Sequence, residues 1–163
     1  MTVELVRLDD RLVHGQVVVG WGQALAISLV VLVDDKVRES EWEQELYRMG
    51  TPPEMEVYFN SVSAATEAMS KYATDARHGI LLTGTITAML SLTRNAGVRQ
   101  VNIGGIHHRS DRKQKLRYVF LSPEEEQELR QMASEGVSVT AQDVPATRPV
   151  ELTELLESEA SVQ

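Results

Sequence analysis

Residues 7–16 bring one histidine together with two carboxylates and two guanidinium groups, a combination suited to carrying a phosphoryl group. The segment reads Arg-Leu-Asp-Asp-Arg-Leu-Val-His-Gly-Gln, and His14 is its one imidazole. Imidazole is largely neutral and nucleophilic near pH 7 because its unperturbed pKa is about 6.5. Arg7 and Arg11 would offset the repulsion between a phosphate and the nearby carboxylates through charge-assisted hydrogen bonds. These residue types predict a phosphoryl-carrier site with His14 as the nucleophile.

The ring nitrogen that does not attack phosphorus must be held by an acceptor, and the sequence leaves this acceptor open. Asp9, Asp10 or a backbone carbonyl group could serve. The backbone N–H groups of Gly15 and Gln16 would complete a phosphate cradle, because a helix start leaves such groups unpaired. The alternative interpretation of His14 is an ordinary surface histidine beside a helix N-terminus.

Short apolar runs alternate with amphipathic runs along the chain, which is typical of α/β proteins. The runs at 28–34 and 79–83 are continuously apolar, as expected for strands covered on both faces. The predicted strands are 3–8, 28–34, 55–59, 79–83, 99–103, 117–121 and 137–142. The predicted helices are 16–26, 38–49, 62–72, 85–96, 123–134 and 151–157. We therefore predict one domain over residues 1–163, with a doubly wound, mostly parallel sheet of about seven strands and helices on both faces.

Parallel topology would gather several loops around His14. Ligands of open α/β sheets bind at the carboxyl ends of the strands, and His14 follows the first predicted strand. The turns at 34–35 and 104–105 should open onto the same edge. Thr83 and Gly84 should do so as well, and we predict that they contact the phosphate.

Composition and charge exclude several classes of protein. The 163 residues include no cysteine, so a disulfide scaffold and thiolate chemistry are excluded. The net charge of −8 argues against general binding to nucleic acid. No run approaches the roughly 18 apolar residues of a membrane span, and no signal-peptide pattern opens the sequence. We expect a cytoplasmic protein.

Two further groups of residues suggest partner contacts rather than chemistry. In the basic segment 109–117, Arg109 and Arg112 are candidates for docking an acidic or phosphorylated partner, although a plain solvated loop explains the charges equally well. His107 and His108 alone are a weak metal signature, so we predict neither a metal nor a cofactor. Trp42 lies on an acidic helical run and is expected to be either half buried or part of a protein contact.

The segment Arg7-Leu-Asp-Asp-Arg-Leu-Val-His-Gly-Gln-Val resembles the signature of the mannose/sorbose-type IIB components of the bacterial phosphoenolpyruvate-dependent sugar phosphotransferase system. The runs Val-Val-Leu-Val-Asp-Asp-Lys-Val at 30–37 and Val-Asn-Ile-Gly-Gly-Ile at 101–106 resemble further family segments. So do Gln-Asp-Val-Pro at 142–145 and Pro-Val-Glu-Leu at 149–152. The resemblance therefore covers nearly the whole chain.

The resemblance implies a carrier phosphorylated on His14, expected at Nδ1, with Asp10, Arg11 and Gly15 as flanking loop residues. Its donor would be a phospho-IIA protein, and its acceptor a sugar held by membrane IIC and IID components. The chain would then associate peripherally with the membrane, and a homodimer is possible. The sugar is not named: mannose, fructose, sorbose and amino sugars all remain open.

Two departures from the family pattern keep other roles open. Residues 83–86 read Thr-Gly-Thr-Ile where the family commonly carries a lysine, and 34–35 read Asp-Asp where it commonly has Asn-Asp. They motivate a regulatory module, whose phosphorylation state rather than sugar transport is the output. A third alternative is an anion-binding α/β domain that never forms phosphohistidine.

Overall fold

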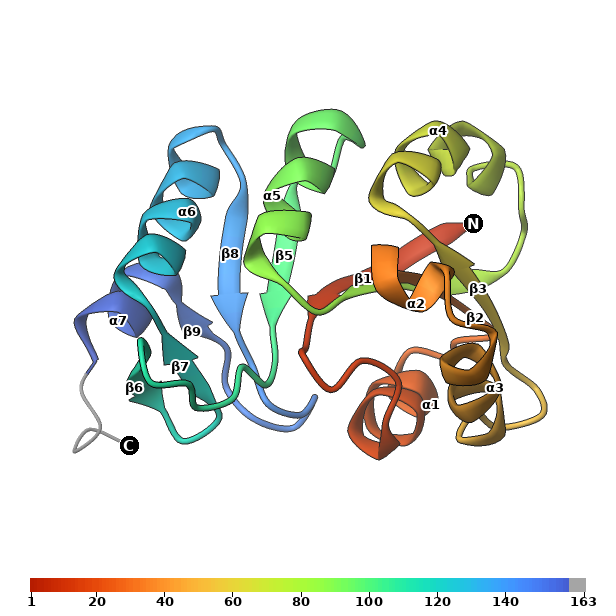
Figure 1. The fold of residues 1–163 in the computed structure, drawn as a ribbon, viewed down its shortest axis with the longest axis horizontal. Coiled ribbons are helices and arrows are strands. Elements are labelled where there is room, and N and C mark those ends of the chain that lie inside the picture. The colour runs from red at the N-terminus through yellow and green to blue at the C-terminus, as the bar shows by residue number, and fades with distance from the viewer. Residues whose placement is uncertain (159–163) are drawn as a thin grey trace.

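Seven strands form the central sheet, in the order β3-β2-β4-β1-β5-β8-β9, in the computed structural model, which describes residues 1–158 (Figure 1). The first six strands in this order are parallel, and β9 pairs antiparallel with β8. Their bounds are β1 Thr2–Leu8, β2 Leu29–Val33, β3 Glu56–Asn60, β4 His78–Thr83, β5 Gln100–Ile103, β8 Ser138–Ala141 and β9 Val150–Glu151.

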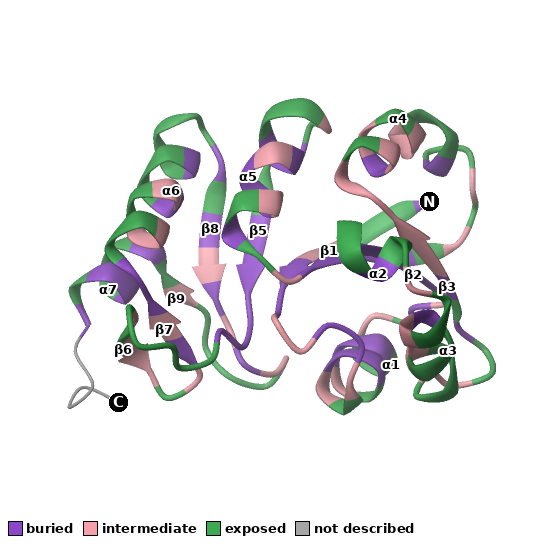
Figure 2. Cartoon of the chain, viewed as in Figure 1, coloured by how far each residue is buried: buried purple, intermediate pink, exposed green. Residues whose placement is uncertain are grey.

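Helices cover both faces of this sheet, and the side chains of β2 show why. All five of its residues are buried and alternate between two hydrophobic cores. Leu29, Val31 and Val33 join the core beneath α4, α5 and α6, whereas Val30 and Leu32 join the core beneath η1 and α2. The buried layer between the helices is visible in Figure 2. The predicted doubly wound fold is confirmed.

Most helices begin where a polar side chain caps them. Ser122 accepts from Glu125 N, and the Glu125 carboxylate accepts from Ser122 N in return, which is the expected capping box of α6. The helix predicted at 38–49 begins later, as α3, because the Ser40 hydroxyl caps a new helix there. Residue 38 instead ends α2, a separate short helix that was not predicted. The helix bounds are η1 Gln16–Trp21, α1 Gly22–Ala24, α2 Asp35–Arg38, α3 Glu41–Met49, α4 Val62–Tyr72, α5 Ile86–Asn95, α6 Pro123–Ser134 and α7 Leu152–Glu157.

One strand lies elsewhere than predicted. The segment 117–121 was expected in the central sheet, but β7 (Val119–Leu121) pairs antiparallel with β6 (Lys113–Leu116) in a separate hairpin. Val119 and Leu121 still reach the main core, so their apolar pattern did indicate burial. The seventh strand of the sheet is instead β9. Within the described part of the chain, no helix has the length and apolar character needed to span a bilayer.

Candidate active site

Strand register brings four loops to one edge of the sheet. Leu8 at the end of β1 is paired with Thr83 of β4 and with Ile103 of β5, and Ile103 is paired with Ala141 of β8. The loops that start after these residues therefore leave the sheet side by side. The loop after β1 carries His14.

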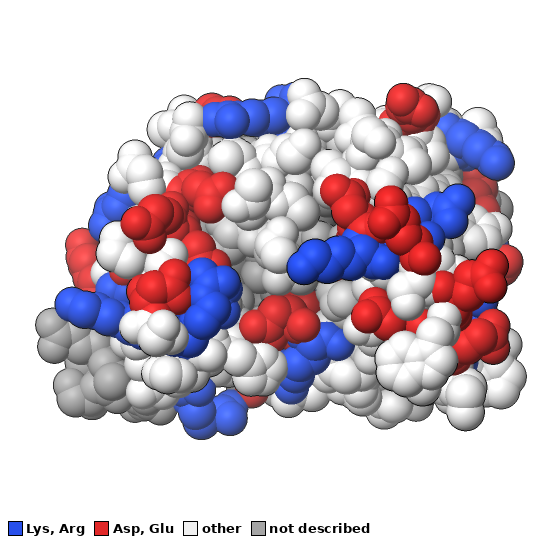
Figure 3. Space-filling model, viewed as in Figure 1, with Lys and Arg blue, Asp and Glu red and all other residues white. Residues whose placement is uncertain are grey.

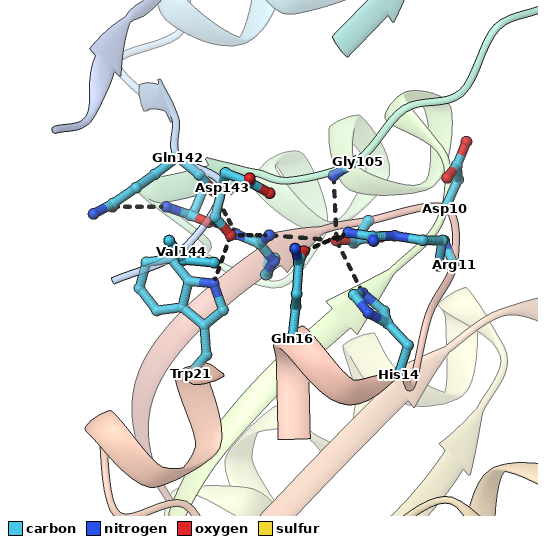
Figure 4. Close-up of polar contacts among 12 residues, drawn as sticks. Asp10, Arg11, His14, Gln16, Trp21, Gly105, Gln142, Asp143 and Val144 are labelled. Atoms are coloured by element: carbon cyan, nitrogen blue, oxygen red, sulfur yellow. Dashed lines mark hydrogen bonds and ion pairs between the residues drawn. The ribbon is translucent and has the colours of Figure 1, made fainter. Parts of the chain in front are cut away.

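A buried carboxylate, that of Asp9, lies at the centre of this edge. Its side chain has 0% relative exposure, and its Oδ2 atom lies 3.3 Å from Arg7 Nη2, 3.1 Å from Arg11 Nη2 and 3.2 Å from His14 Nε2. The same oxygen accepts from Gly105 N, and Oδ1 accepts from Arg11 N and Nε (Figure 4). Asp9 thus contacts all three basic residues of the loop, Arg7, Arg11 and His14.

His14 presents its two ring nitrogens to different surroundings. Nε2 is buried; its one neighbouring acceptor is Asp9 Oδ2 at 3.2 Å, and the ring N–H points off the line of a regular hydrogen bond. Nδ1 has no hydrogen-bond partner among residues 1–158, and the side chain is 18% exposed. One nitrogen is therefore turned inward to the carboxylate, and the other is left without a protein partner.

The surroundings of Asp9 keep its carboxylate ionised. Burial alone would raise the pKa of Asp9, but the close contact of His14, the hydrogen bonds from Arg11 and the charge of Arg7 outweigh that effect and hold the pKa well below its usual range. An ionised Asp9 favours a proton on Nε2 of His14, which leaves the lone pair of the imidazole on Nδ1.

Arg7 was predicted to contact phosphate, but its guanidinium is wholly enclosed by the protein. Its side chain is 0% exposed and donates to Asn102 Oδ1 and to the backbone oxygens of Gln142 and Asp143, at 2.9 and 3.1 Å for the last two. The guanidinium also lies 5.1 Å from the ring of Trp21, whose Nε1 donates to the Asp143 carbonyl. Burial lowers the pKa of Arg7, opposed by the charge of Asp9. Arg7 thus holds Asp9 from the protein interior and does not face solvent.

Arg11, Gly15 and Gln16 lie beside His14 and reach the surface. Arg11 is 32% exposed at its side chain and donates from Nη2 to Gln16 Oε1 at 2.8 Å. Gly15 precedes η1, whose first turn is not capped by any described side chain. Leu12 has a φ of 59°, in the left-handed region that is costly for a branched residue, and this turn lets Arg11 and His14 converge on Asp9. Such strain is common at functional loops.

Asp10 points away from His14, so it is not the acceptor that holds the imidazole. Its Oδ2 accepts from His107 N at 2.8 Å, and its Oδ1 contacts His107 Nδ1. Arg112 donates to the His107 carbonyl at 2.9 Å and forms two 2.8 Å bonds with Glu125. Asp10 therefore links the His14 loop to the loop after β5 and, through Arg112, to the start of α6.

Thr83 and Gly84 lie beneath the His14 loop and support its backbone. The Thr83 carbonyl accepts from Asp9 N at 3.0 Å, and its side chain is buried. Gly84 packs against Leu12, which leaves little room for a side chain there. The carboxylates of residues 34–35 are occupied with capping: Asp34 accepts from two N–H groups of α2, and Asp35 accepts from Val62 N.

The basic segment 109–117 is largely neutralised by neighbouring carboxylates. Arg109 pairs with Asp111 at 2.7 Å, and Arg112 pairs with Glu125 and is 12% exposed. The other pairs are Lys115 with Glu126 and Arg117 with Asp143. Figure 3 accordingly shows blue and red side chains intermixed over this part of the surface. The segment is not a continuous positive patch.

The acid dependence of stability tests the role of Asp9. Because its folded-state pKa lies below the unfolded value of about 3.9, ionised Asp9 stabilises the fold above about pH 4, and this contribution is lost as the pH falls toward the folded-state pKa. We expect the free energy of unfolding to fall more steeply between about pH 5 and pH 2 in the wild type than in Asp9→Asn. Urea unfolding at several pH values measures this. Asp111→Asn, which changes an exposed pair, is the control; equal slopes for wild type and Asp9→Asn would contradict the assignment.

Several site residues escaped prediction because they act through backbone atoms. The carbonyl groups of Gln142 and Asp143 hold Arg7, and no side-chain pattern reports a backbone acceptor. The turn at 104–105 was predicted at this edge, and the structure shows why Gly104 is a glycine. A Cβ atom there would overlap the Arg7 guanidinium. No pattern in the sequence predicted the contact between His107 and Asp10 that the structure shows.

Several known proteins with similar sequences and structures are described as IIB components of phosphotransferase systems. The family profile described as "PTS system sorbose subfamily IIB component" matches residues 3–163. The N-acetylgalactosamine-specific phosphotransferase enzyme IIB component 1 of Escherichia coli K12 is 30% identical over 144 residues, 86% of this chain and 90% of that protein. The sorbose-specific EIIB component of Klebsiella pneumoniae is 29% identical over 140 residues, 85% of each chain. The crystal structure of the IIBSor domain of the sorbose permease from Klebsiella pneumoniae superposes with a TM-score of 0.88 at 27% identity, covering 98% of this chain and 99% of that one.

Proposed function

Because the chain belongs to the sorbose subfamily of phosphotransferase-system IIB components, a family of sugar phosphotransfer, we propose that His14 is its phosphoryl carrier. It would accept the group from a phospho-IIA protein and pass it to a sugar bound by membrane IIC and IID components. The observation that carries this proposal is the position of His14, with Nε2 on a buried, ionised Asp9 and Nδ1 without a protein partner.

The reaction follows from this arrangement of the imidazole. The Nδ1 lone pair attacks the donor's phosphorus, so a P–N bond to His14 forms as the bond to the donor's side chain breaks. The Nε2 proton stays in place beside Asp9, which stabilises the positive charge that the phosphorylated ring gains. In the second step a sugar hydroxyl oxygen attacks phosphorus, the P–N bond breaks, and the hydroxyl proton leaves to solvent or to a base on the sugar-binding partner.

The surrounding groups divide into those that contact phosphate and those that position His14. We assign phosphate contact to the Arg11 guanidinium and to the backbone N–H groups of Gly15 and Gln16, because these lie beside His14 at the surface. Two guanidinium groups outnumber the single central carboxylate, which favours an incoming dianion. Arg7 is a positioning residue in this scheme. Thr83 and Gly84 support the loop and do not bind phosphate.

The proposed partners and location follow from the family. Interaction with IIA proteins and with the IIC and IID membrane components is implied for IIB components as a class. For this chain we propose a cytoplasmic location, with peripheral association at the membrane while phosphate is transferred. Both predicted docking arginines are paired with a carboxylate, but the Arg109 side chain is 56% exposed and that of Arg112 only 12%, so Arg109 is the better placed of the two.

Phosphate transfer in two stages tests the proposal. Incubation with a phosphorylated IIA protein of the sorbose family is expected to label the chain with phosphate that survives alkali and is lost in acid. Nitrogen-15 NMR of the labelled imidazole is expected to place the phosphate on Nδ1. Nanodiscs carrying sorbose-family IIC and IID components, with mannose, fructose, sorbose or N-acetylgalactosamine, are then expected to yield a sugar phosphate.

Each stage has an outcome that contradicts it. Absence of any label under a competent donor would leave an anion-binding domain without phosphohistidine. Phosphate that stays on the chain in the presence of every sugar and of the membrane components would instead favour the regulatory role.

A further inference from the structure

An apolar stripe lies on the outer face of α3. Trp42, Leu46 and Met49 are spaced at i, i+4 and i+7, so they share one side of the helix. Their residues are 70%, 48% and 80% exposed. Large apolar side chains exposed together, and Trp and Met in particular, are characteristic of protein interfaces. We call these three residues the α3 stripe.

The opposite side of α3 already provides its attachment to the domain. Gln44 is buried and donates to the carbonyl groups of Val37 and Arg38, both at 3.0 Å, and Tyr47 packs against the core beneath η1 and α2. Gln44 and Tyr47, and not the most exposed members of the α3 stripe, Trp42 and Met49, thus attach the helix to the domain. The exposure of the α3 stripe has no explanation in the fold itself.

Acidic side chains surround the α3 stripe. Glu41, Glu43 and Glu45 belong to the same helix, and its one cation, Arg48, is paired with Glu45 at 3.1 Å and stacked on Phe59. Figure 3 shows red side chains over α2 and α3, at the right of the view, with some blue ones among them. A partner of this surface must therefore combine apolar anchors with positive charge.

Charge argues against two possible occupants. A second copy of the chain would bring the two sets of glutamates together, on proteins of net charge −8. An anionic lipid surface would repel the same glutamates. Cytoplasmic loops of membrane proteins, by contrast, carry an excess of Lys and Arg and adjoin apolar segments.

We infer that the α3 stripe docks this protein on a basic, apolar cytoplasmic segment of its membrane-embedded phosphotransfer partner. The inference rests on the proposed function, since that function supplies a membrane partner. It adds a contact surface on α3, separate from the residues around His14, that determines affinity for the membrane component and not the chemistry of transfer.

The two tryptophans of the chain allow docking to be measured directly. Trp21 is 5% exposed and already buried, whereas Trp42 is the exposed one, so a partner that covers the α3 stripe should shift the emission of Trp42 to shorter wavelength. We would titrate the full chain with nanodiscs carrying sorbose-family IIC and IID components, with empty nanodiscs of the same anionic lipid, and with a IIA protein. The expected result is a blue shift with the loaded nanodiscs alone, weakened by salt.

Variants that keep Trp42 as the reporter separate docking from chemistry. Leu46→Ser/Met49→Ser is expected to weaken binding at least about tenfold, and Glu41→Gln/Glu43→Gln is expected to weaken it and reduce its salt dependence. Val3→Ser, at an exposed apolar residue on β1, is the matched control and should bind as the wild type does. All of these variants should still take phosphate from phospho-IIA at the wild-type rate.

Three results would overturn the inference. They are wild-type binding by Leu46→Ser/Met49→Ser, a Trp42 shift with empty nanodiscs or with IIA, and a shift that appears on concentrating the chain alone. Loss of phosphorylation in the wild type would overturn the proposed function instead, and the fluorescence titration distinguishes the two because it needs no phosphate.

Discussion

Replacing His14 by alanine is expected to abolish phosphate incorporation from phospho-IIA while leaving the fold intact. The loss should be complete, because the substitution removes the atom that forms the P–N bond and no neighbouring group can replace a nucleophile held at that place. His14 is partly exposed and its Nε2 has no regular hydrogen bond, so little packing is lost with it. Radiolabelled phosphate counts the transfer, and thermal unfolding verifies the fold.

The other three histidines provide matched controls for this experiment. His78 pairs with Glu4 at the opposite end of β4, His107 is held by Asp10, and His108 packs edge-on against Phe120. Alanine at His78 or His108 should leave labelling unchanged. Alanine at His107 should slow labelling, since it removes the imidazole contact of Asp10 and keeps only the backbone N–H bond, but should not abolish it. If His14→Ala is labelled and His107→Ala is not, His107 is the nucleophile.

Replacing Arg7 by methionine is expected to lower the free energy of unfolding by about 3–5 kcal/mol, the cost of breaking a buried ion pair by removing one partner. The substitution keeps an apolar stem beside Trp21, but it leaves the Asn102 side chain and the Gln142 carbonyl without their donor and the Asp143 carbonyl with Trp21 alone. Asp9 would keep Arg11 and His14 as partners while losing its buried support. Urea unfolding with linear extrapolation measures the change.

Arg109→Met is the control for Arg7→Met, because it removes an arginine of the same length from an exposed pair. Its cost should stay below about 1 kcal/mol, as surface ion pairs contribute little. A cost for Arg7→Met as small as that of Arg109→Met would show that Arg7 does not hold the site together. In that case its predicted contact with phosphate would again be the better interpretation.

The sequence predicted those features that depend on local patterning. The fully apolar β2 and the capping box at Ser122 predicted a buried strand and a helix start, and both are present. The pairing of 117–121 was mispredicted because an apolar strand reports burial but not its neighbour. The choice between the central sheet and a hairpin with β6 depends on tertiary contacts that the pattern does not contain.

The candidate site shows the same contrast between what local sequence predicts and what tertiary contacts decide, here for single side chains. The sequence of the loop 7–16 indicated that basic side chains and a carboxylate would gather there, but not that Asp10 would point away from His14 or that Arg7 would be buried. Arg7 lies on β1 with its side chain pointing into the protein against Trp21, whereas Arg11 comes after the strand and reaches solvent. Asp9 and Asp10 are adjacent in sequence, yet they face different loops because the chain turns between them.

The hydrogen bonds that hold the Arg7 guanidinium also have a consequence for the order of folding. Its contacts join residues 95, 135 and 136 positions apart, and the Trp21 bond to Asp143 spans 122. Contacts between such distant positions form late, because closing a long loop costs entropy before the contact can repay it. The loop of His14 lies near the start of the chain, but its support arrives with the segment after β8. On the proposed function, a nascent or half-folded chain would carry His14 without the contacts that position it, and we expect the chain to take phosphate only once folding is complete.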